Sequence, residues 1–216
     1  MKFSTKAAVL LTTIFASTAH AGIINSYDID FSALPLTAHQ QNSGSYSTWD
    51  FNGSVLNLKE DAWFTLNVND AFGIASLDID NASTNIELSF DFRVKANSAG
   101  SYSEIAGIWL ADFSGGEQNY DAGRTFNLDG TQNFGLDDIA YTNGESWQTF
   151  TIKLDDYMAG IITDIVFIND CDASVGCSDM NVRFRNASIS EVSEPTAMSL
   201  ILLGMGFMGW RARRQK

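Results

Sequence analysis

The chain is poor in several residue types on which common catalytic and metal sites depend. Its 216 residues include 2 cysteines and 2 histidines, and only His39 lies beyond position 21. One histidine cannot complete a zinc site with two cysteines, and nothing pairs it with a nucleophilic serine. Cys171 and Cys177 lack the Cys-x-x-Cys spacing of redox enzymes, and glycine-rich phosphate loops are absent. These absences argue against several familiar classes of enzyme.

Basic residues are scarce between residues 22 and 194, the body that remains when both ends are set aside. The body contains all 26 acidic residues and 7 basic ones, so its net charge is 7 − 26 = −19, against −13 for the whole chain. The basic residues are Lys59, Arg93, Lys95, Arg124, Lys153, Arg183 and Arg185. A field of this sign repels nucleic acid and anionic membranes, and also anionic polysaccharides unless a cation such as Ca²⁺ bridges them. Such acidity also fits a protein kept soluble outside the cell.

The first 21 residues have the three-part layout of a secretory signal peptide. Two lysines precede an apolar run over residues 7–16, and Ala19 and Ala21 occupy the small-residue positions that signal peptidase reads. The apolar run is too short for the roughly 30 Å core of a bilayer. We therefore predict an N-terminal signal helix over residues 1–21 and a mature chain that begins at Gly22. The alternative is a buried N-terminal helix.

Residues 191–216 form a second distinctive segment. It contains Ser193-Glu194-Pro195, then an apolar stretch at 197–210, then Arg211, Arg213 and Arg214. An apolar helix over 197–210 reaches about 21 Å, which is marginal for a lasting transmembrane span. The arginines that follow would stay on the cytoplasmic side and leave the body outside.

This tail resembles the PEP-CTERM sorting signal, in which a Pro-Glu-Pro-like motif, an apolar stretch and a terminal arginine cluster follow in that order. Ser193 stands where that signal has its first proline, whereas Glu194 and Pro195 match. The resemblance implies transient anchoring in the inner membrane, cleavage by an exosortase, and transfer to the cell surface or matrix alongside exopolysaccharide. An ordinary C-terminal membrane anchor is the alternative.

Between the two ends, apolar and polar residues alternate with the period of β-strands. From Ile86 to Val94, every second residue is apolar and the residues between are polar. Further strands are expected at 46–51, 55–59, 63–68, 105–111, 147–154, 162–168 and 181–189, separated by turns such as Asn143-Gly144. We predict one all-β domain over residues 22–190, folded as a two-sheet antiparallel, jelly-roll-like sandwich.

Several of these segments resemble a carbohydrate-binding module of secreted bacterial polysaccharide-degrading enzymes. They are residues 88–94, 124–135, 147–152, 165–170 and 183–189. The resemblance implies a jelly-roll-like fold and binding of a polysaccharide. The acidic cluster of that module is altered here, because Cys171 stands between Asp170 and Asp172.

Two predictions concern the loop that begins at residue 170. Cys171 and Cys177 are the only cysteines of a chain expected outside the cell, so we predict a disulfide that contributes about 2 kcal/mol. Asp170, Asp172 and Asp179 offer the oxygen ligands that a structural Ca²⁺ prefers. The alternative is a solvated acidic loop held by the disulfide, and no other cofactor is expected.

Candidate ligand-binding residues lie on strand faces or beside turns: Asp91, Arg93, Tyr102, Tyr120, Arg183 and Arg185. Arg183 and Arg185 are two positions apart on one strand and therefore share a face. They could hold carboxylate or sulfate groups, or pair with acids of the chain itself. The tyrosines could stack on a sugar ring, whereas most tryptophans of a sandwich, Trp109 among them, are expected in the core.

These patterns favour an exported, exosortase-processed protein of the cell surface or extracellular matrix that binds polysaccharide and is not an enzyme. No catalytic residue stands out, although the carboxylate pair of a small glycoside hydrolase or polysaccharide lyase is one alternative. A structural or adhesive surface protein without a sugar site is another. The expected partners are signal peptidase, exosortase and extracellular polysaccharide, with transient membrane contact through the tail and no nucleic acid.

Overall fold

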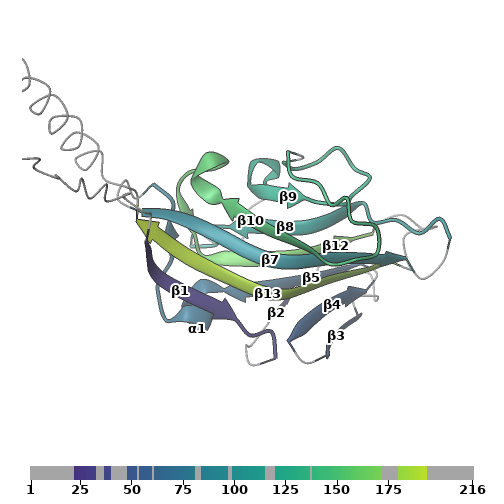
Figure 1. Ribbon diagram of the computed structural model, residues 1–216, viewed down its shortest axis with the longest axis horizontal. Helices are drawn as coiled ribbons and strands as arrows, with labels where there is room; N and C mark the ends of the chain where they lie inside the picture. Colours follow the sequence, from purple (N-terminus) through teal and green to yellow (C-terminus); the bar gives the residue numbers. More distant parts are fainter. Residues whose placement is uncertain are drawn as a thin grey trace, which may run out of the picture. The chain divides into compact units, whose positions relative to one another are not determined.

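The computed structural model (Figure 1) describes residues 22–32, 37–39, 48–52, 54–59, 61–80, 84–96, 99–114, 120–136, 138–171 and 180–193. The body, Gly22–Glu194, forms one compact unit. The predicted signal peptide, the motif residues Glu194 and Pro195 and the tail with its arginines lie outside the described residues, as do the helices predicted there. No helix within the described ranges has the length and hydropathy that a bilayer crossing requires.

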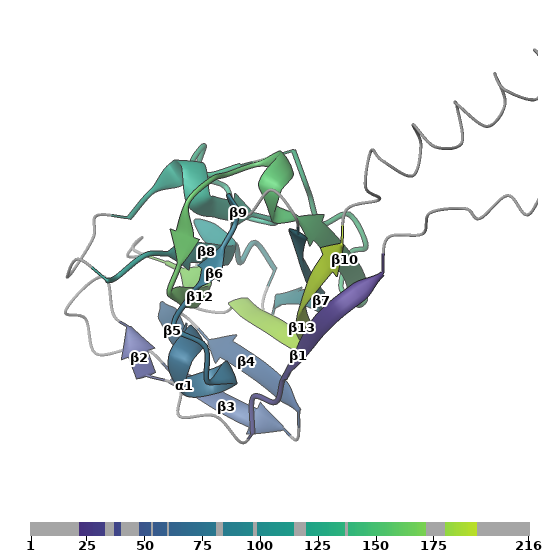
Figure 2. The ribbon, with the colours of Figure 1, turned by 90° about the vertical axis from the view of Figure 1, so that its left-hand side faces the viewer.

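Six antiparallel strands form the first sheet (Figures 1 and 2). They follow the order β10 (Gln148–Lys153), β7 (Thr84–Ala96), β13 (Met180–Ser193), β4 (Val55–Lys59) and β3 (Thr48–Asn52), and β1 (Ile23–Ile29) also pairs with β13. The long strands β7 and β13 pair along most of their length. On the other edge of β13, β4 pairs with its first part and β1 with its second part.

Five antiparallel strands form the second sheet. Their order is β2 (Thr37–His39), β5 (Ala62–Asn67), β12 (Asp164–Asp170), β8 (Ile105–Ala111) and β9 (Thr125–Asn127). A separate ladder joins β6 (Leu77–Asp78) to β11 (Ile161–Ile162). Figure 2 shows β5, β8 and β12 on one side of the body and β4, β7 and β13 on the other. The predicted all-β class and two-sheet antiparallel sandwich are confirmed.

Side chains from the inner faces of the two sheets form the main core. In β7 the predicted alternation is confirmed, because the apolar residues from Ile86 to Val94 are all buried in this core. Phe184 of β13 and Phe167 of β12 meet between the sheets, with ring centroids 5.0 Å apart. Full burial of one such side chain contributes about 1.5–3 kcal/mol, so the core holds the sheets together.

A second hydrophobic cluster covers the outer face of the second sheet. It contains Trp63, Trp109 and four smaller apolar residues of β8 and β12. Three aromatic residues from the segment between β8 and β10 pack against it. Strand β8 is consequently buried at every position, which explains why residues 105–111 are apolar throughout instead of alternating. The predicted burial of Trp109 is confirmed, since it is 2% exposed.

The short helix α1 (Val68–Phe72) begins at the last residue of the strand predicted at 63–68. The strand stops earlier because the Asn67 side chain accepts hydrogen bonds from the backbone N–H groups of Asn69 (3.1 Å) and Asp70 (3.2 Å). An asparagine in this position satisfies the free N–H groups at the start of a helix. Two short 3₁₀ turns are also present, η1 (Ala122–Arg124) and η2 (Leu154–Asp156).

Strand β13 continues beyond residue 190, where the predicted domain ends, and stops at Ser193. The Ser193 N–H donates to the Gly22 carbonyl oxygen at 2.9 Å, and the Gly22 N–H donates to Ser193 Oγ at 3.0 Å. Strand β1, which follows Gly22, has no counterpart among the predicted strands. The first residue of the predicted mature chain thus contacts the first residue of the predicted sorting motif.

Candidate ligand-binding face

The outer face of the first sheet carries the polar residues that alternate with core residues in β4, β7, β10 and β13. Four of the predicted ligand-binding residues come together there, because the register places Arg183 opposite Arg93 and Arg185 opposite Asp91. Directly opposed residues on neighbouring strands have Cβ atoms about 4.5–5.5 Å apart. The sequence indicated only that Arg183 and Arg185 share a face, and the pairing of β13 with β7 supplies their neighbours.

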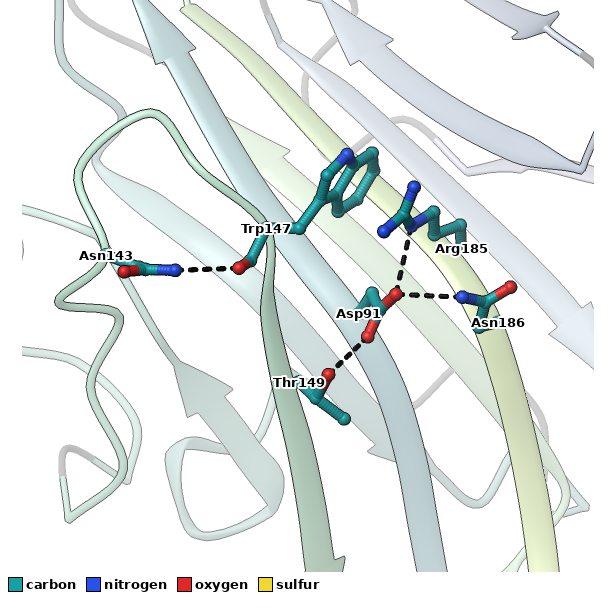
Figure 3. Close-up of polar contacts among 6 residues, drawn as sticks. All are labelled: Asp91, Asn143, Trp147, Thr149, Arg185 and Asn186. Carbon is teal, nitrogen blue, oxygen red and sulfur yellow. Dashed lines mark hydrogen bonds and ion pairs between the residues drawn. The ribbon is translucent and has the colours of Figure 1, made fainter.

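Asp91 is the centre of a hydrogen-bonded group on this face (Figure 3). One carboxylate oxygen accepts from Thr149 Oγ1 at 2.6 Å, and the other accepts from Arg185 Nε at 2.9 Å and Asn186 Nδ2 at 2.8 Å. Burial alone would raise the pKa of Asp91, but these donors and the Arg185 charge outweigh burial and hold the pKa below its ordinary value. Asp91 is therefore ionised at neutral pH and forms an ion pair with Arg185.

A β-bulge in β13 brings Asn186 to this group. The register against β7 shifts between Arg185 and Ser188, and Asn186 has a φ of 49°, in the left-handed region. Asparagine adopts this conformation more readily than most residues, because its short side chain can bond locally. The bulge lies where the partner of β13 changes, since pairing with β4 ends at Phe184 and pairing with β1 begins at Ala187.

Trp147 lies directly before β10 and adds an aromatic ring to the face (Figure 3). The guanidinium carbon of Arg185 is 4.1 Å from the ring centroid, and that of Arg93 is 5.9 Å away. Both distances lie within the roughly 6 Å range of cation–π attraction. The Asn143 side chain donates to the Trp147 carbonyl oxygen at 2.7 Å, which ties the residue to the predicted Asn143-Gly144 turn. Trp147 is half-buried, so part of it remains accessible.

Sequence reasoning did not place Trp147 among the ligand-binding residues, because a tryptophan in a sandwich strand is usually in the core. A usable signal was its position in the alternation of the strand, in which every second residue faces the same side of the sheet. Phe150 and Ile152 are buried, whereas Thr149 and Thr151 are exposed. Position 147 has the same parity as the two threonines, so it belongs to the outer face.

Arg93 and Arg183 form a pair of like charges beside the Asp91 group. The Arg183 Nε donates to Asn57 Oδ1 at 2.9 Å, whereas the Arg93 Nε is buried without a hydrogen-bond partner. Neither guanidinium forms an ion pair with a carboxylate of the described residues. Like charges that are directly opposed on neighbouring strands destabilise a sheet. This pair is therefore suited to an anionic group of a ligand.

The two predicted tyrosines do not join this group. The Tyr120 ring packs into the second cluster, 4.9 Å from Trp63, 5.1 Å from Trp109 and 4.5 Å from Phe134 between centroids. Burial raises the pKa of its hydroxyl above the ordinary value. Tyr102 is half-buried in the segment before β8 of the second sheet. The turn-rich segment that contains Tyr120 folds over the apolar outer face of that sheet, so the tyrosine contributes to packing there.

The residues predicted to bind calcium and to form a disulfide are only partly described. Asp170 ends β12 and is buried, and its Oδ1 accepts a hydrogen bond from Trp63 Nε1 at 3.3 Å. Outside the described residues lie Asp172, Cys177 and Asp179. Within the described ranges, no three His, Cys, Asp or Glu side chains gather as a metal site would require. Cys171 is not a free cysteine, and both its pairing with Cys177 and the calcium site stay predictions.

Comparison with known proteins gives little further information. No protein-family model matches the chain, and no curated protein matches it. Among solved structures, the chain is similar to a low-affinity xylan-binding module, CBM86, from the gut symbiont Roseburia intestinalis. The two share 13% sequence identity at a TM-score of 0.37, over 78% of this chain and 95% of that chain. A similarity of this size says nothing about the ligand of this chain.

Proposed function

We propose that this chain is an exported, non-catalytic protein of the cell surface or extracellular matrix that binds polysaccharide on the outer face of its first sheet. The observation that carries this proposal is the grouping of Trp147, Arg185 and Asp91. The Arg185 guanidinium lies 4.1 Å from the indole centroid and its Nε lies 2.9 Å from the Asp91 carboxylate. This group lies on the polar face of the sheet, outside the core.

The chemistry of the group suits a sugar. The C–H face of a pyranose packs against an aromatic ring, and Trp147 offers such a ring beside the sheet. Sugar hydroxyl groups need oriented donors and acceptors, which Arg93, Arg183 and Thr151 provide on the same face. Asp91 already holds the Arg185 side chain in place. Binding of a sugar therefore does not have to order that side chain, which lowers the entropic cost of binding.

The same geometry disfavours catalysis on this face. A glycoside hydrolase needs a carboxylic acid with a raised pKa to protonate the leaving oxygen. The pKa of Asp91 is lowered instead, because its burial is outweighed by the donors that stabilise the charged form. Asp91 therefore positions Arg185, and we assign it no proton transfer.

The export part of the proposal is supported by the two ends of the sequence. The basic start, apolar run and Ala19-x-Ala21 pattern support cleavage by signal peptidase before Gly22. The Ser193-Glu194-Pro195 motif, apolar stretch and arginines support cleavage by an exosortase. The bond from the Ser193 N–H to the Gly22 carbonyl gives a physical reason for the absence of proline at this position, because proline has no N–H to donate.

A structural or adhesive role without a sugar site is the competing function, and one observation favours it. Asp91, Thr149, Arg185 and Asn186 satisfy one another through hydrogen bonds. A group of this kind can serve solely to hold β7, β10 and β13 together. The two functions differ in what they predict for Trp147, which takes no part in those bonds through its side chain.

Glycan-array binding by the wild-type chain and by variants of Trp147 separates the two functions. Trp147→Ala should weaken binding by about tenfold, equivalent to about 1.4 kcal/mol, whereas Trp147→Phe keeps a ring and should retain most of it. Ile161→Ala, at a position 43% exposed on β11, is the matched control and should bind like wild type. Thermal unfolding checks the fold of each variant. The proposal is wrong if the wild type binds no glycan at millimolar concentration, or if Trp147→Ala binds as tightly as wild type.

A further inference from the structure

Most basic residues of the acidic body lie on the outer face of the first sheet. Six of the seven alternate with core residues of β4, β7, β10 and β13: Lys59, Arg93, Lys95, Lys153, Arg183 and Arg185. The seventh, Arg124, lies in η1 and donates to the carbonyl oxygens of Ala159 and Ile161. The basic residues of a body with a net charge of 7 − 26 = −19 are therefore gathered on one face, where Glu87 lies opposite Lys153 and Asp91 lies opposite Arg185.

Acidic side chains neutralise only part of this face. Asp91 pairs with Arg185 at 2.9 Å, and Lys153 pairs with two aspartates of η2 at 2.9 and 3.6 Å. Arg93 and Arg183 are opposed in register and have no carboxylate partner among the described residues. An anion bound between these two arginines would offset the repulsion between their like charges.

The Asp91 group shows how this face holds a carboxylate. There, donors from three strand residues converge on one carboxylate at distances of 2.6 to 2.9 Å. Two residues further along the same strands, which is about 6.6–6.8 Å, Arg93 and Arg183 present two guanidinium groups. Guanidinium groups bind carboxylates through parallel charge-assisted hydrogen bonds that are roughly twice as strong as neutral ones.

We infer that the ligand is a polysaccharide that carries carboxylate groups, as uronic acid residues do, and that Arg93 and Arg183 bind one of these carboxylates beside Trp147. This inference rests on the proposed function and adds the chemical class of the ligand. Net charge alone predicts that the body repels anionic polysaccharides. The two arginines without a carboxylate partner reverse that expectation for their part of the face, while the acidic remainder of the surface confines the polymer to it.

Affinity electrophoresis of the full chain tests whether the ligand carries carboxylates. The chain is kept in non-ionic detergent, and EDTA removes cations that could bridge it to the polymer. The probes are polygalacturonate, alginate, each of these polymers after reduction of its carboxylates to alcohols, and dextran sulfate. We expect one of the two uronate polymers to bind at least about tenfold more tightly than its reduced form. Binding to the uronate should weaken as NaCl rises, because salt screens exposed charges.

Variants of the arginines locate the contact. Arg93→Gln and Arg183→Gln should each weaken uronate binding by about fivefold or more. They should weaken binding to the reduced polymer by less, because a glutamine side chain can still donate to a sugar hydroxyl group. Arg93→Lys and Arg183→Lys keep the charge, so their affinity for the uronate should lie between that of the wild type and that of the glutamine variants. This intermediate affinity would show that the glutamine variants lose a contact with the ligand and not the fold. Lys153→Gln is the matched control, because its charge already pairs with Asp155 at 2.9 Å, and it should change neither interaction.

The outcomes distinguish this inference from the proposed function. If the reduced polymers bind as tightly as the uronates, the polysaccharide-binding face stands and the carboxylate inference is wrong. Tighter binding to dextran sulfate than to either uronate also overturns it, with sulfate as the preferred anion. Binding to none of the probes contradicts the inference, while the glycan array decides the proposed function separately.

Discussion

Asp91→Asn removes a negative charge from the point where Thr149, Arg185 and Asn186 converge. Asparagine has nearly the same shape, but its amide would face one of these donors, and its oxygen carries no full charge. Hydrogen bonds to charged groups contribute about 1.5–3 kcal/mol each to stability. Because the Arg185 side chain is 36% exposed, solvent screens its share. We therefore expect the free energy of unfolding to fall by about 2 kcal/mol.

Thermal unfolding of residues 22–194, the unit that contains both hydrophobic clusters, measures this loss. For a domain of this size, 1 kcal/mol shifts Tm by about 2–4 °C, so Asp91→Asn should lower Tm by about 4–8 °C at pH 7. Asp156→Asn is the matched control, since that side chain is 61% exposed and its ion pair contributes little. It should shift Tm by no more than about 2 °C.

The difference between wild type and Asp91→Asn should depend on pH in a defined direction. Burial acts to raise the pKa of Asp91 in the folded state, but the hydrogen-bond donors and the Arg185 charge outweigh burial and lower that pKa. Such a carboxylate contributes its full stabilisation above its unfolded pKa of about 3.9, and loses it as the pH falls through the lower folded value. The Tm difference should therefore be complete at pH 7 and shrink below about pH 4. A Tm difference below about 1 °C at pH 7, or one that stays constant to about pH 2.5, would refute this reasoning.

Substitutions at three further positions test other contacts. Gly107→Ala would place a Cβ atom against the Phe126 carbonyl oxygen, so β9 must shift. Urea unfolding should show that the free energy of unfolding falls by about 3 kcal/mol or more. An unchanged urea midpoint would contradict the close approach of these two strands. Asn186→Ala keeps a left-handed residue without its bond to Asp91 and should cost about 1–2 kcal/mol, whereas Asn186→Gly should cost less, because glycine adopts that conformation freely. Equal losses for the two variants would mean that the backbone conformation is not strained. Ser193→Pro removes both the N–H and the Oγ that bond to Gly22 and should lower stability by about 1 kcal/mol or more. Ser193→Ala removes only the Oγ and should lower stability less; the reverse order in urea would count against the bond from the Ser193 N–H.

The sandwich could be predicted because its central strands carry their burial pattern in the sequence. The alternation from Ile86 to Val94 is unbroken, and residues 105–111 are apolar because both faces of β8 are covered. Strand β1 (Ile23–Ile29) could not be found in this way, because most of its residues are exposed. Its place is set by backbone pairing with β13, which leaves no apolar period in the sequence.

The binding face could be predicted only along single strands. Parity shows that Arg183 and Arg185 share a face, but it does not show which strand lies beside them or in which register. A slip of one residue would turn every side chain of a strand to the opposite face. The bulge at Asn186 is a local departure that no periodicity contains. For the same reason, net charge could not reveal that six of the seven basic residues lie on one face.

The most direct test of the binding face is an NMR titration of isotope-labelled residues 22–194 with a polysaccharide fragment selected on the glycan array. We expect the largest chemical-shift changes at the indole N–H of Trp147 and at the backbone amides of β7 and β13 around Arg93 and Arg185. Changes confined to the second sheet around Tyr102 and Tyr120, or no changes at saturating ligand, would contradict binding on the outer face of the first sheet.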